Sequence, residues 1–526
     1  MPMNEFDYVI VGGGSAGCAA AARLAEDPAV RVCLLEAGGD GRSFLVDTPL
    51  LLAVTVPSRL HNWAFETEPQ SGLGGRRGYQ PRGKALGGSS AINAMIYMRG
   101  HPGDYDDWAA AGSPGWSWRD VLPVFRRGEH NERGGDEHHG TGGPLNVADL
   151  RSPNPISLAF VEAGVQAGHA RNADFNGASQ SGVGLYQVTQ KNGRRWSAAR
   201  AYLDAARGRG NLTVQTGAQA LRLVLDGKTC TGVETTRGTV RARRETIVCA
   251  GVFGSPQLLL LSGIGPREEI ERHGIALRHE LPGVGANLQD HPDYVIGYLS
   301  PAPGLLGLNP RGLMNIVRGI GDFRREGSGI LSSNIAEAGG FLESREGLER
   351  PDLQLHFCIG LVADHGRDRT PRYGFSCHVC LLRPKNRGRV ALRSADPLAP
   401  PLIDPAFLAD DEDAALLAHG VGLTMNILRQ GALAPFRGAN VFGEDWITGD
   451  ALVDLVRKRA DSVYHPAGTC RMGTADDAVV DAQLRVRGVE RLRVADASIM
   501  PTLIGGNTNA PAIMIGERCA QFVRSA

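Results

Sequence analysis

The stretch DYVIVGGGSAGCAAAARLAEDPAVRVCLLE, residues 7–36, decides the fold of this 526-residue chain. Residues 7–11 and 31–35 are short apolar runs typical of buried strands, and the small, helix-favouring residues 16–25 lie between them. A strand, a helix and a second strand within about thirty residues form the first unit of a doubly wound parallel sheet. The stretch therefore predicts an α/β fold.

Three glycines follow the first predicted strand in a G-x-G-x-x-G pattern. Gly12 permits a tight turn, Gly14 lets the backbone approach a pyrophosphate, and Gly17 lets the helix pack closely against the strand. Glu36 stands 19 residues after Gly17, where a carboxylate can accept hydrogen bonds from ribose hydroxyls. Together these residues predict a Rossmann-like dinucleotide site, and an acid at position 36 disfavours a 2′-phosphate. The pattern by itself does not separate NAD from FAD.

The composition excludes several classes of protein. Lys+Arg and Asp+Glu both number 56, so the formal net charge of +0 gives no reason to expect a nucleic-acid partner. No apolar run approaches the roughly 18 residues of a transmembrane helix, and the longest, PLLLAVTVP at 49–57, is bracketed by prolines. Nine scattered cysteines without a signal peptide predict reduced thiols and a cytoplasmic protein.

The rest of the chain predicts a second domain interleaved with the first. Residues 37–150 are rich in glycine, proline and polar residues and predict long loops that cover a ligand site. The stretch 211–226 alternates apolar and polar residues as a pair of neighbouring strands does, and the alternating stretches 353–360 and 373–382 favour an antiparallel sheet within 296–460. Further predicted elements are strands at 245–250 and 491–494 and helices at 255–262 and 510–523. The dinucleotide domain is assigned to 1–155, 206–295 and 480–526, and a substrate domain, an antiparallel sheet with helices, to 156–205 and 296–479.

Five motifs, in the same order along the chain, resemble those of the glucose-methanol-choline (GMC) oxidoreductases. They are GGGSAG…LLEAGG near the start, GKALGGSSAIN at 83–93, AGVFGSPQLLLLSGIG at 250–265, HPAGTCRMG at 465–473 and DASIMPTLIGGNTNAP at 496–511. The stretches HNWAFETEPQ at 61–70 and RWSAAR at 195–200 are most similar to the bacterial choline and aliphatic alcohol dehydrogenases. The resemblance implies that the dinucleotide is FAD.

The resemblance also implies a reaction, the oxidation of a primary, aliphatic alcohol to the aldehyde by hydride transfer to flavin N5. A quinone or another acceptor other than oxygen is expected to take the electrons. His465 matches the family's catalytic histidine, and an imidazole with an ordinary pKa of about 6.5 can accept the hydroxyl proton. Asn509, 44 residues later, is expected to hold the substrate oxygen. The implied FAD contacts are Gly12, Gly14, Ser15, Ala16, Gly17, Glu36, Ala37, Trp63, Gly87, Gly88, Ser90, Asn93, Ala94, Ile96, Ala220, Tyr464, Asp496, Ala497, Asn509 and Pro511.

Ile92 bears on how the flavin is attached. Family members with a covalently bound flavin carry a histidine just before the asparagine of the second glycine-rich loop. This chain has Ile92 before Asn93, and isoleucine has no nucleophile. The resemblance therefore implies non-covalent FAD.

Several alternatives stay open from the sequence. A choline dehydrogenase or an alcohol oxidase that produces H2O2 would share the motifs, as would a lyase that retains its flavin or a flavin-binding protein without catalysis. The aromatic content of 6% favours an aliphatic alcohol over choline, whose trimethylammonium group needs a negative or aromatic site. Glu337 is expected to line the substrate cavity. A quinone acceptor would favour peripheral contact with the inner membrane, but the sequence identifies no amphipathic docking segment.

Other chemistry-bearing residues are predicted to have no part in the reaction. The stretch CHVC at 377–380 is expected to pack in the core, as is Cys470, so no metal site is predicted. The pair at 138–139 (HH) and the run at 410–413 (DDED) are expected to be solvated. The run at 104–107 (DYDD) is expected to belong to a loop over the active site.

Overall fold

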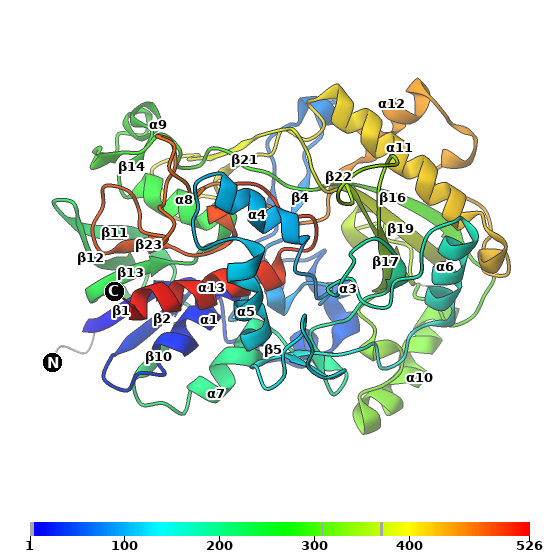
Figure 1. The fold of residues 1–526 in the computed structure, drawn as a ribbon, viewed down its shortest axis with the longest axis horizontal. Helices are drawn as coiled ribbons and strands as arrows, with labels where there is room; N and C mark the ends of the chain where they lie inside the picture. Colours follow the sequence, from blue (N-terminus) through cyan, green and yellow to red (C-terminus); the bar gives the residue numbers. More distant parts are fainter. Residues whose placement is uncertain (1–4, 308, 369–371, 526) are drawn as a thin grey trace.

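The computed structural model describes residues 5–307, 309–368 and 372–525. The chain forms two large sheets with helices packed on them, and segments from both ends of the sequence meet at the first sheet (Figure 1). The predicted α/β architecture is confirmed. None of the helices in the described ranges is long and apolar enough to cross a membrane.

The first sheet has seven strands and contains the predicted strand–helix–strand unit. Its strands are β1 (Glu5–Val11), β2 (Val32–Glu36), β10 (Leu212–Thr216), β11 (Ala220–Asp226), β12 (Thr229–Thr235), β13 (Gly238–Val248) and β23 (Leu492–Val494). They follow the order β10-β2-β1-β13-β12-β11, with β23 also paired to β13. The stretch 211–226 does form two strands, but the expectation that they pair is wrong. β10 extends the parallel edge beside β2, whereas β11 turns back on β12 at the other edge.

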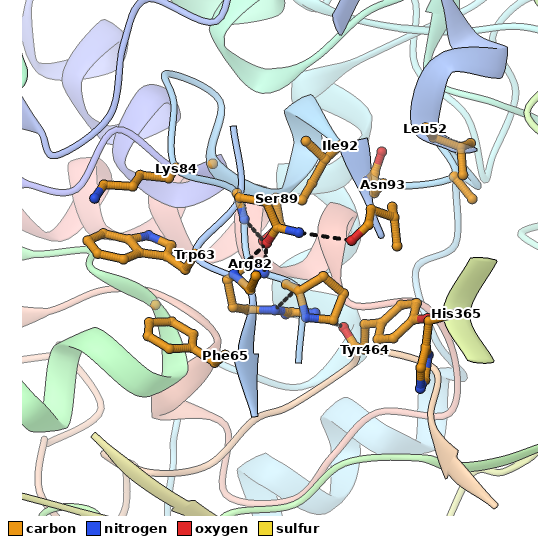
Figure 2. Close-up of a pocket in the computed structure, with 18 of the residues that line it drawn as sticks. Leu52, Trp63, Phe65, Arg82, Lys84, Ser89, Ile92, Asn93, His365 and Tyr464 are labelled. Carbon is orange, nitrogen blue, oxygen red and sulfur yellow. Dashed lines mark hydrogen bonds between the residues drawn. The ribbon is translucent and has the colours of Figure 1, made fainter. Parts of the chain in front are cut away.

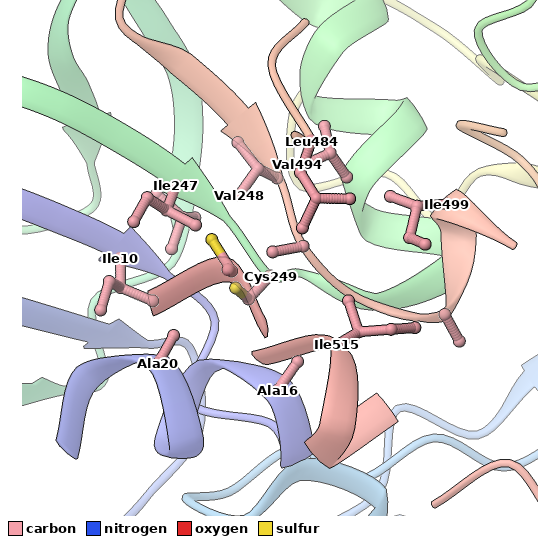
Figure 3. Close-up of a cluster of buried hydrophobic side chains, with 14 of the residues drawn as sticks. Ile10, Ala16, Ala20, Ile247, Val248, Cys249, Leu484, Val494, Ile499 and Ile515 are labelled. Atoms are coloured by element: carbon pink, nitrogen blue, oxygen red, sulfur yellow. The ribbon is translucent and has the colours of Figure 1, made fainter. Parts of the chain in front are cut away.

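Helices from both ends of the chain pack together against this sheet. α1 (Ser15–Leu24) follows β1, and α13 (Asn509–Arg524) lies along it. The approach is so close that a Cβ atom on Gly516 would lie 2.2 Å from the carbonyl oxygen of Ala16. Ala16 of α1 and Ile515 of α13 belong to one continuous buried cluster with Ile10 and Ile247 of the strands (Figure 3).

The second sheet has six strands, and all neighbouring strands are antiparallel, as predicted for this part of the chain. In spatial order they are β22 (Asp461–Ser462), β16 (Pro292–Leu299), β19 (Gly374–Leu381), β18 (Leu353–Cys358), β17 (Ala336–Leu342) and β7 (Gly182–Leu185). The helices α6 (Pro155–Gln166), α11 (Asp411–Leu428) and α12 (Asp450–Arg459) lie on its outer side (Figure 1). Along β18, Leu355 and Phe357 pack toward these helices, and the alternating His356 and Cys358 face an internal cavity.

The assignment of residues to two domains stays a prediction. One of its boundaries, between 295 and 296, falls inside β16, all of which belongs to the second sheet.

The expectation of long loops over 37–150 is wrong for residues 102–128, which form α4 (Pro102–Ala110) and α5 (Trp118–Gly128). α4 begins with a capping box, in which the His101 side chain accepts from the backbone of Gly103 and the Asp104 side chain accepts from the backbone of His101. Asp104 therefore lies in a helix and not in a loop over the active site. Its buried carboxylate forms ion pairs with Arg350 and Arg383.

The remaining elements are short, apart from α10, and connect the two sheets. They are α2 (Phe44–Asp47), η1 (Pro49–Leu51), α3 (Leu52–Thr55), β3 (Phe65–Glu66), η2 (Ser71–Leu73), β4 (Tyr79–Gln80), η3 (Gly88–Ala91), β5 (Glu129–Asn131), β6 (Leu145–Val147), β8 (Gln190–Lys191), β9 (Arg194–Arg195), the π-helix η4 (Ala199–Leu203), α7 (Asp204–Ala206), α8 (Gly251–Leu261), β14 (Ile264–Gly265), α9 (Arg267–Arg272), β15 (His279–Glu280), α10 (Pro310–Glu326), η5 (Ile330–Ser332), η6 (Asp364–Gly366), β20 (Arg389–Ala391), β21 (Leu402–Asp404), η7 (Gly431–Leu433), η8 (Glu444–Trp446) and η9 (Ala497–Ile499).

Candidate active site

A cavity of about 1330 Å³ runs between the two sheets. One end is lined by the glycine turn after β1 and by Glu36 at the end of β2. The other end is lined by His356 of β18, His465 and Asn507. One continuous space thus joins the predicted dinucleotide site to the predicted catalytic histidine.

The glycine turn is packed as a dinucleotide turn requires. Gly12 has φ +105, and a Cβ atom on Gly17 would lie 1.9 Å from the Gly12 carbonyl oxygen. Gly14 lines the cavity, and the nearest atom to a Cβ placed there is 4.0 Å away. Gly17 therefore permits the packing of helix on strand, and Gly14 leaves room for a ligand at the N-terminus of α1, where free N–H groups favour a pyrophosphate.

Glu36 lies in the cavity wall with its carboxylate fixed by the backbone. Its Oε2 accepts from the N–H of Gly13 at 2.9 Å and its Oε1 from the N–H of Gly38 at 2.7 Å. Burial raises the pKa of Glu36 to about 7, against the lowering effect of these hydrogen bonds. Each oxygen retains a lone pair. The side chain thus fits the binding of ribose hydroxyls.

The second glycine-rich loop closes over the turn. The N–H of Gly87 donates to the carbonyl of Gly13 at 2.7 Å. The buried guanidinium of Arg195 holds the loop from behind and donates to the carbonyl oxygens of Ser90 and Asn93, at 3.2 and 2.7 Å. Burial lowers the pKa of Arg195 to about 9, and the charge of Asp47 offsets only part of this effect. Arg195 therefore fixes the backbone of a loop whose Asn93 lines the cavity.

Three histidines gather at the far end of the cavity. His465 Nδ1 lies 3.1 Å from Nδ1 of His291, and His465 Nε2 lies 3.0 Å from the amide nitrogen of Asn507. That nitrogen is also 3.3 Å from Nε2 of His356. Gln354 donates to the Asn507 amide oxygen at 2.9 Å, which fixes the amide with its nitrogen toward the imidazoles. Asn507 therefore donates to His465 Nε2, and that nitrogen acts as an acceptor.

The surroundings keep His465 neutral. The pKa of His465 is held well below its ordinary value, mainly by burial. The neighbouring His291, His356 and Arg82 lower it further. The backbone N–H of His465 donates to Asp290 at 2.8 Å and anchors the residue beside the second sheet. A neutral imidazole with an accepting Nε2 can take a proton from a bound hydroxyl group.

The structure places the side chain of Asn509 beside the glycine turn and not beside His465. The amide oxygen of Asn509 accepts from the hydroxyl of Ser15 at 2.7 Å, so Asn509 lies beside the glycine turn. Asn507, and not Asn509, contacts His465, and it follows His465 by 42 residues. The motif GNTNAP contains two asparagines, and spacing alone could not choose between them. The start of α13 at Asn509 directs the two side chains to different ends of the cavity.

A family model described as GMC oxidoreductase matches residues 6–293 with its N-terminal part and residues 384–516 with its C-terminal part. The chain belongs to the GMC oxidoreductase family. It is 45% identical to an alcohol dehydrogenase (acceptor) of Pseudomonas putida, over 98% of this chain and 95% of that protein. It is 42% identical to an oxygen-dependent choline dehydrogenase of Brucella anthropi, over 99% and 95% of the two chains.

Solved structures match this GMC oxidoreductase over nearly its whole length. Pyridoxine 4-oxidase from Mesorbium loti has a TM-score of 0.89 and 32% identity, over 99% of both chains. Formate oxidase of Aspergillus oryzae RIB40 has a TM-score of 0.91 and 27% identity, over 100% of this chain and 99% of that one. The GMC oxidoreductases bind FAD, and the cavity described above has the turn, the carboxylate and the length for it.

Most of the FAD contacts implied by the resemblance line this one cavity, and four do not. Gly17 and Gly87 act through backbone packing, Ser90 bonds to the backbone of Gly87 and Ala198, and Pro511 is buried in α13. The residues that line the cavity are Gly12, Gly14, Ser15, Ala16, Glu36, Ala37, Trp63, Gly88, Asn93, Ala94, Ile96, Ala220, Tyr464, Asp496, Ala497 and Asn509.

Tyr464, directly before His465, is held by its own contacts. Its φ is +71, and its hydroxyl bonds to Nδ1 of His365, whose Nε2 lies 2.8 Å from Asp461. Figure 2 shows Tyr464 beside His365, with Ile92 and Asn93 of the second loop on another wall of the cavity. Sequence reasoning missed His365 because it follows no motif.

Three expectations about charged residues are wrong. His139 is buried, with Nδ1 at 3.0 Å from Glu129 and Nε2 at 2.8 Å from Asp174, so it is not solvated. Asp413, at the start of α11, is also buried and accepts from the N–H of Lys385. Glu337 does not line the cavity. Its carboxylate is buried among three donors, the hydroxyls of Ser157 and Ser333 and the backbone N–H of Asn154.

The expectation for the cysteines is confirmed. Cys377, Cys380 and Cys470 are all free and buried, and Cys470 belongs to the core cluster of the first sheet. Burial raises the pKa of each of these thiols well above its ordinary value. None of them lines the cavity.

Proposed function

We propose that the protein is an FAD-dependent dehydrogenase that oxidises a neutral, aliphatic primary alcohol to the aldehyde and passes the electrons to a quinone or another acceptor other than oxygen. The observation that carries this proposal is the contact between His465 and Asn507 at one end of a cavity that begins at the dinucleotide turn. The identity to an acceptor-dependent alcohol dehydrogenase supports the class of reaction.

Different residues of this chain carry out different parts of the proposed alcohol oxidation. Bound FAD supplies the acceptor for a hydride. The substrate hydroxyl would replace the direct hydrogen bond between Asn507 and Nε2 of His465. Nε2 then accepts the hydroxyl proton, since its depressed pKa keeps it unprotonated at neutral pH. The amide nitrogen of Asn507 is placed to donate to the substrate oxygen and to stabilise the negative charge that develops there. His291 holds the imidazole through Nδ1 and fixes its orientation.

Several features favour a neutral substrate over choline. The Oδ2 atom of Asp293, the acid nearest to His378 in the second sheet, lies 2.6 Å from that histidine, which itself lines the cavity. Burial lowers the pKa of His378, but Asp293 outweighs this effect and raises it well above the ordinary value. The carboxylate is therefore neutralised by an imidazolium and offers no free charge to a trimethylammonium group. The surrounding wall is largely apolar and includes Leu331, Ile335 and Val463.

We also propose that the FAD is held without a covalent bond. Ile92 is buried in the cavity wall and has no nucleophilic atom. Denaturing the holoenzyme with acid is expected to release all of the flavin into the supernatant. Flavin that stays with the precipitated protein would contradict this part of the proposal.

The free cysteines bear on the cellular compartment in which the enzyme acts. All nine cysteines are free and buried, which is typical of a reducing compartment, so we place the enzyme in the cytoplasm. Contact with the inner membrane is part of this proposal, because a quinone acceptor is dissolved in lipid.

The test is a panel of alcohols with a dye acceptor, measured under air and under nitrogen. Aliphatic primary alcohols are expected to reduce the dye without stoichiometric peroxide, and choline is expected to react poorly. The similarity to pyridoxine 4-oxidase and formate oxidase makes peroxide formation the second candidate, and stoichiometric H2O2 would replace the dehydrogenase by an oxidase. If no alcohol bleaches the flavin under nitrogen, the protein is not a redox enzyme for alcohols.

A further inference from the structure

Helix α10 presents an apolar stripe to solvent. Leu313, Met314, Val317 and Ile320 are 51%, 50%, 63% and 37% exposed. Their spacing of one, three and four residues places them on one side of the helix. Gly319 and Phe323 are buried on the side that faces the protein. In the rest of the molecule, most apolar side chains of this size are buried. Four exposed ones on a single helix therefore indicate an interaction surface.

Arginines follow one edge of the stripe. Arg311, Arg318 and Arg325 recur every seven residues, about two helical turns, so they lie in one row beside Met314. All three are exposed, and among the residues that the structure describes Arg311 and Arg318 form no ion pair. The first acid in α10 is Asp322, in the second half of the helix. The stripe is thus bordered by positive charge, the pattern of a helix that lies in a membrane interface.

The stripe continues into the entrance of the cavity. Ile316 and Ile320 of α10 line the cavity, as do Phe44 of α2 and Val54 of α3. Phe44 is 57% and Val54 is 38% exposed, so the cavity reaches the surface at these side chains. η5 packs against both α10 and η1, which joins the helix to the segment that precedes α3. α10 is thus an amphipathic helix with an exposed apolar face that was not identified from the sequence.

We propose that this surface, formed by α10 together with Phe44 and Val54, docks the enzyme on an anionic phospholipid bilayer. Apolar side chains would enter the acyl boundary, and the arginine row would lie at the level of the phosphates. A second copy of the chain fits the surface less well. In an antiparallel two-fold contact, with the axis perpendicular to the helix, the arginine rows of the two copies would lie side by side, and the acid next to each row, Asp322, is already paired with Arg325.

This orientation faces the cavity entrance toward the lipid. It rests on the proposed function in one respect, namely that alcohols or acceptors dissolved in the bilayer would reach the cavity without crossing water. The docking itself is independent of the reaction and is measured without substrate.

The test is flotation of the holoenzyme with vesicles of phosphatidylglycerol and phosphatidylethanolamine, compared with vesicles of phosphatidylcholine. The double variant Leu313→Asp/Val317→Asp is expected to lose at least about ten-fold in binding to the anionic vesicles, because two charges enter the apolar face. Neither residue lines the cavity, so activity with a soluble alcohol and dye is expected to stay unchanged. Leu158→Asp, at an equally exposed leucine of α6, is the matched control and is expected to bind as the wild type does.

A second pair of variants tests the charge. Arg311→Gln/Arg318→Gln is expected to bind anionic vesicles several-fold more weakly and with less dependence on salt. Failure of the wild type to float with anionic vesicles, or undiminished binding of the double aspartate variant, would overturn the proposal. A dimer that dissociates in the aspartate variant, without vesicle binding by the wild type, would assign the surface to a second copy instead. Loss of dye reduction in the wild type would count against the oxidation and leave the docking result standing.

Discussion

The two ends of the cavity are built in different ways. The dinucleotide end is built around a turn of residues close in sequence, where Gly12 and Gly17 leave no room for a Cβ atom beside neighbouring backbone atoms. The histidine end brings together side chains such as His291 and His465, which are 174 residues apart, from different strands and loops. At the first end, added volume is harmful. At the second end, a substitution that changes the chemistry of a side chain is expected to lower activity, whereas the backbone is expected to keep its fold.

The largest effect is expected at the turn. Gly17→Ala places a Cβ atom 1.9 Å from the Gly12 carbonyl oxygen, so the helix must move from the strand and the holoprotein is expected to be lost. Gly14→Ala is the matched control, because its Cβ has 4.0 Å to the nearest atom. That variant is expected to fold and to bind flavin more weakly. Flavin absorbance and thermal unfolding measure both, and a normal Gly17→Ala holoenzyme would contradict the packing argument.

The next effect is chemical. His465→Ala is expected to lower turnover by at least about 100-fold, because it removes the proton acceptor. Flavin content should stay near that of the wild type, since the nearest contacts of His465 are His291 and Asn507. Turnover per bound flavin, measured with a saturating alcohol and dye, is the readout. A variant with full flavin and a loss below about three-fold would assign the proton to another group.

Substitutions of the two asparagines of the GNTNAP motif test whether the two ends of the cavity have different roles. Asn507→Ala is expected to lower kcat/KM by roughly 10- to 100-fold with flavin retained, because a donor to the substrate oxygen is lost. Asn509→Ala removes the acceptor of the Ser15 hydroxyl and is expected to weaken flavin binding more than it lowers the turnover of flavin-loaded enzyme. The reverse outcome would restore the original assignment of Asn509.

The smallest expected effect is on the free energy of unfolding and concerns His139, which lies at neither end of the cavity. Burial lowers the pKa of His139, but Asp174 and Glu129 outweigh it and raise the pKa to about 9. A folded pKa above the unfolded value of about 6.5 gives a contribution that is complete below pH 6.5 and is lost as the pH rises to about 9. It amounts to at most about 3 kcal/mol. The gap in unfolding free energy between wild type and His139→Gln should therefore shrink from pH 6 to pH 10, and a constant gap would contradict the linkage.

Residues 7–36 determined the α/β start, the turn and the carboxylate, since the pattern that predicts them lies within one strand–helix–strand unit. The motifs determined the family and His465 for the same reason, because each motif is a short run with a fixed local shape. The different neighbours of Asn507 and Asn509, His465 for one and Ser15 for the other, required the tertiary structure. Asn507 and Asn509 are only two residues apart in the sequence. Their side chains face different ends of the cavity because α13 begins at Asn509 and packs on α1.

The neighbours of His465 and the exposure of α10 also depended on tertiary contacts. His291 and His356 carry no motif, and their place is fixed by strand pairing over long sequence separations. The apolar periodicity of α10 is present in the sequence, but the same periodicity serves a buried helix equally well. Only the packing of the rest of the chain shows which apolar faces are covered and which are left to solvent.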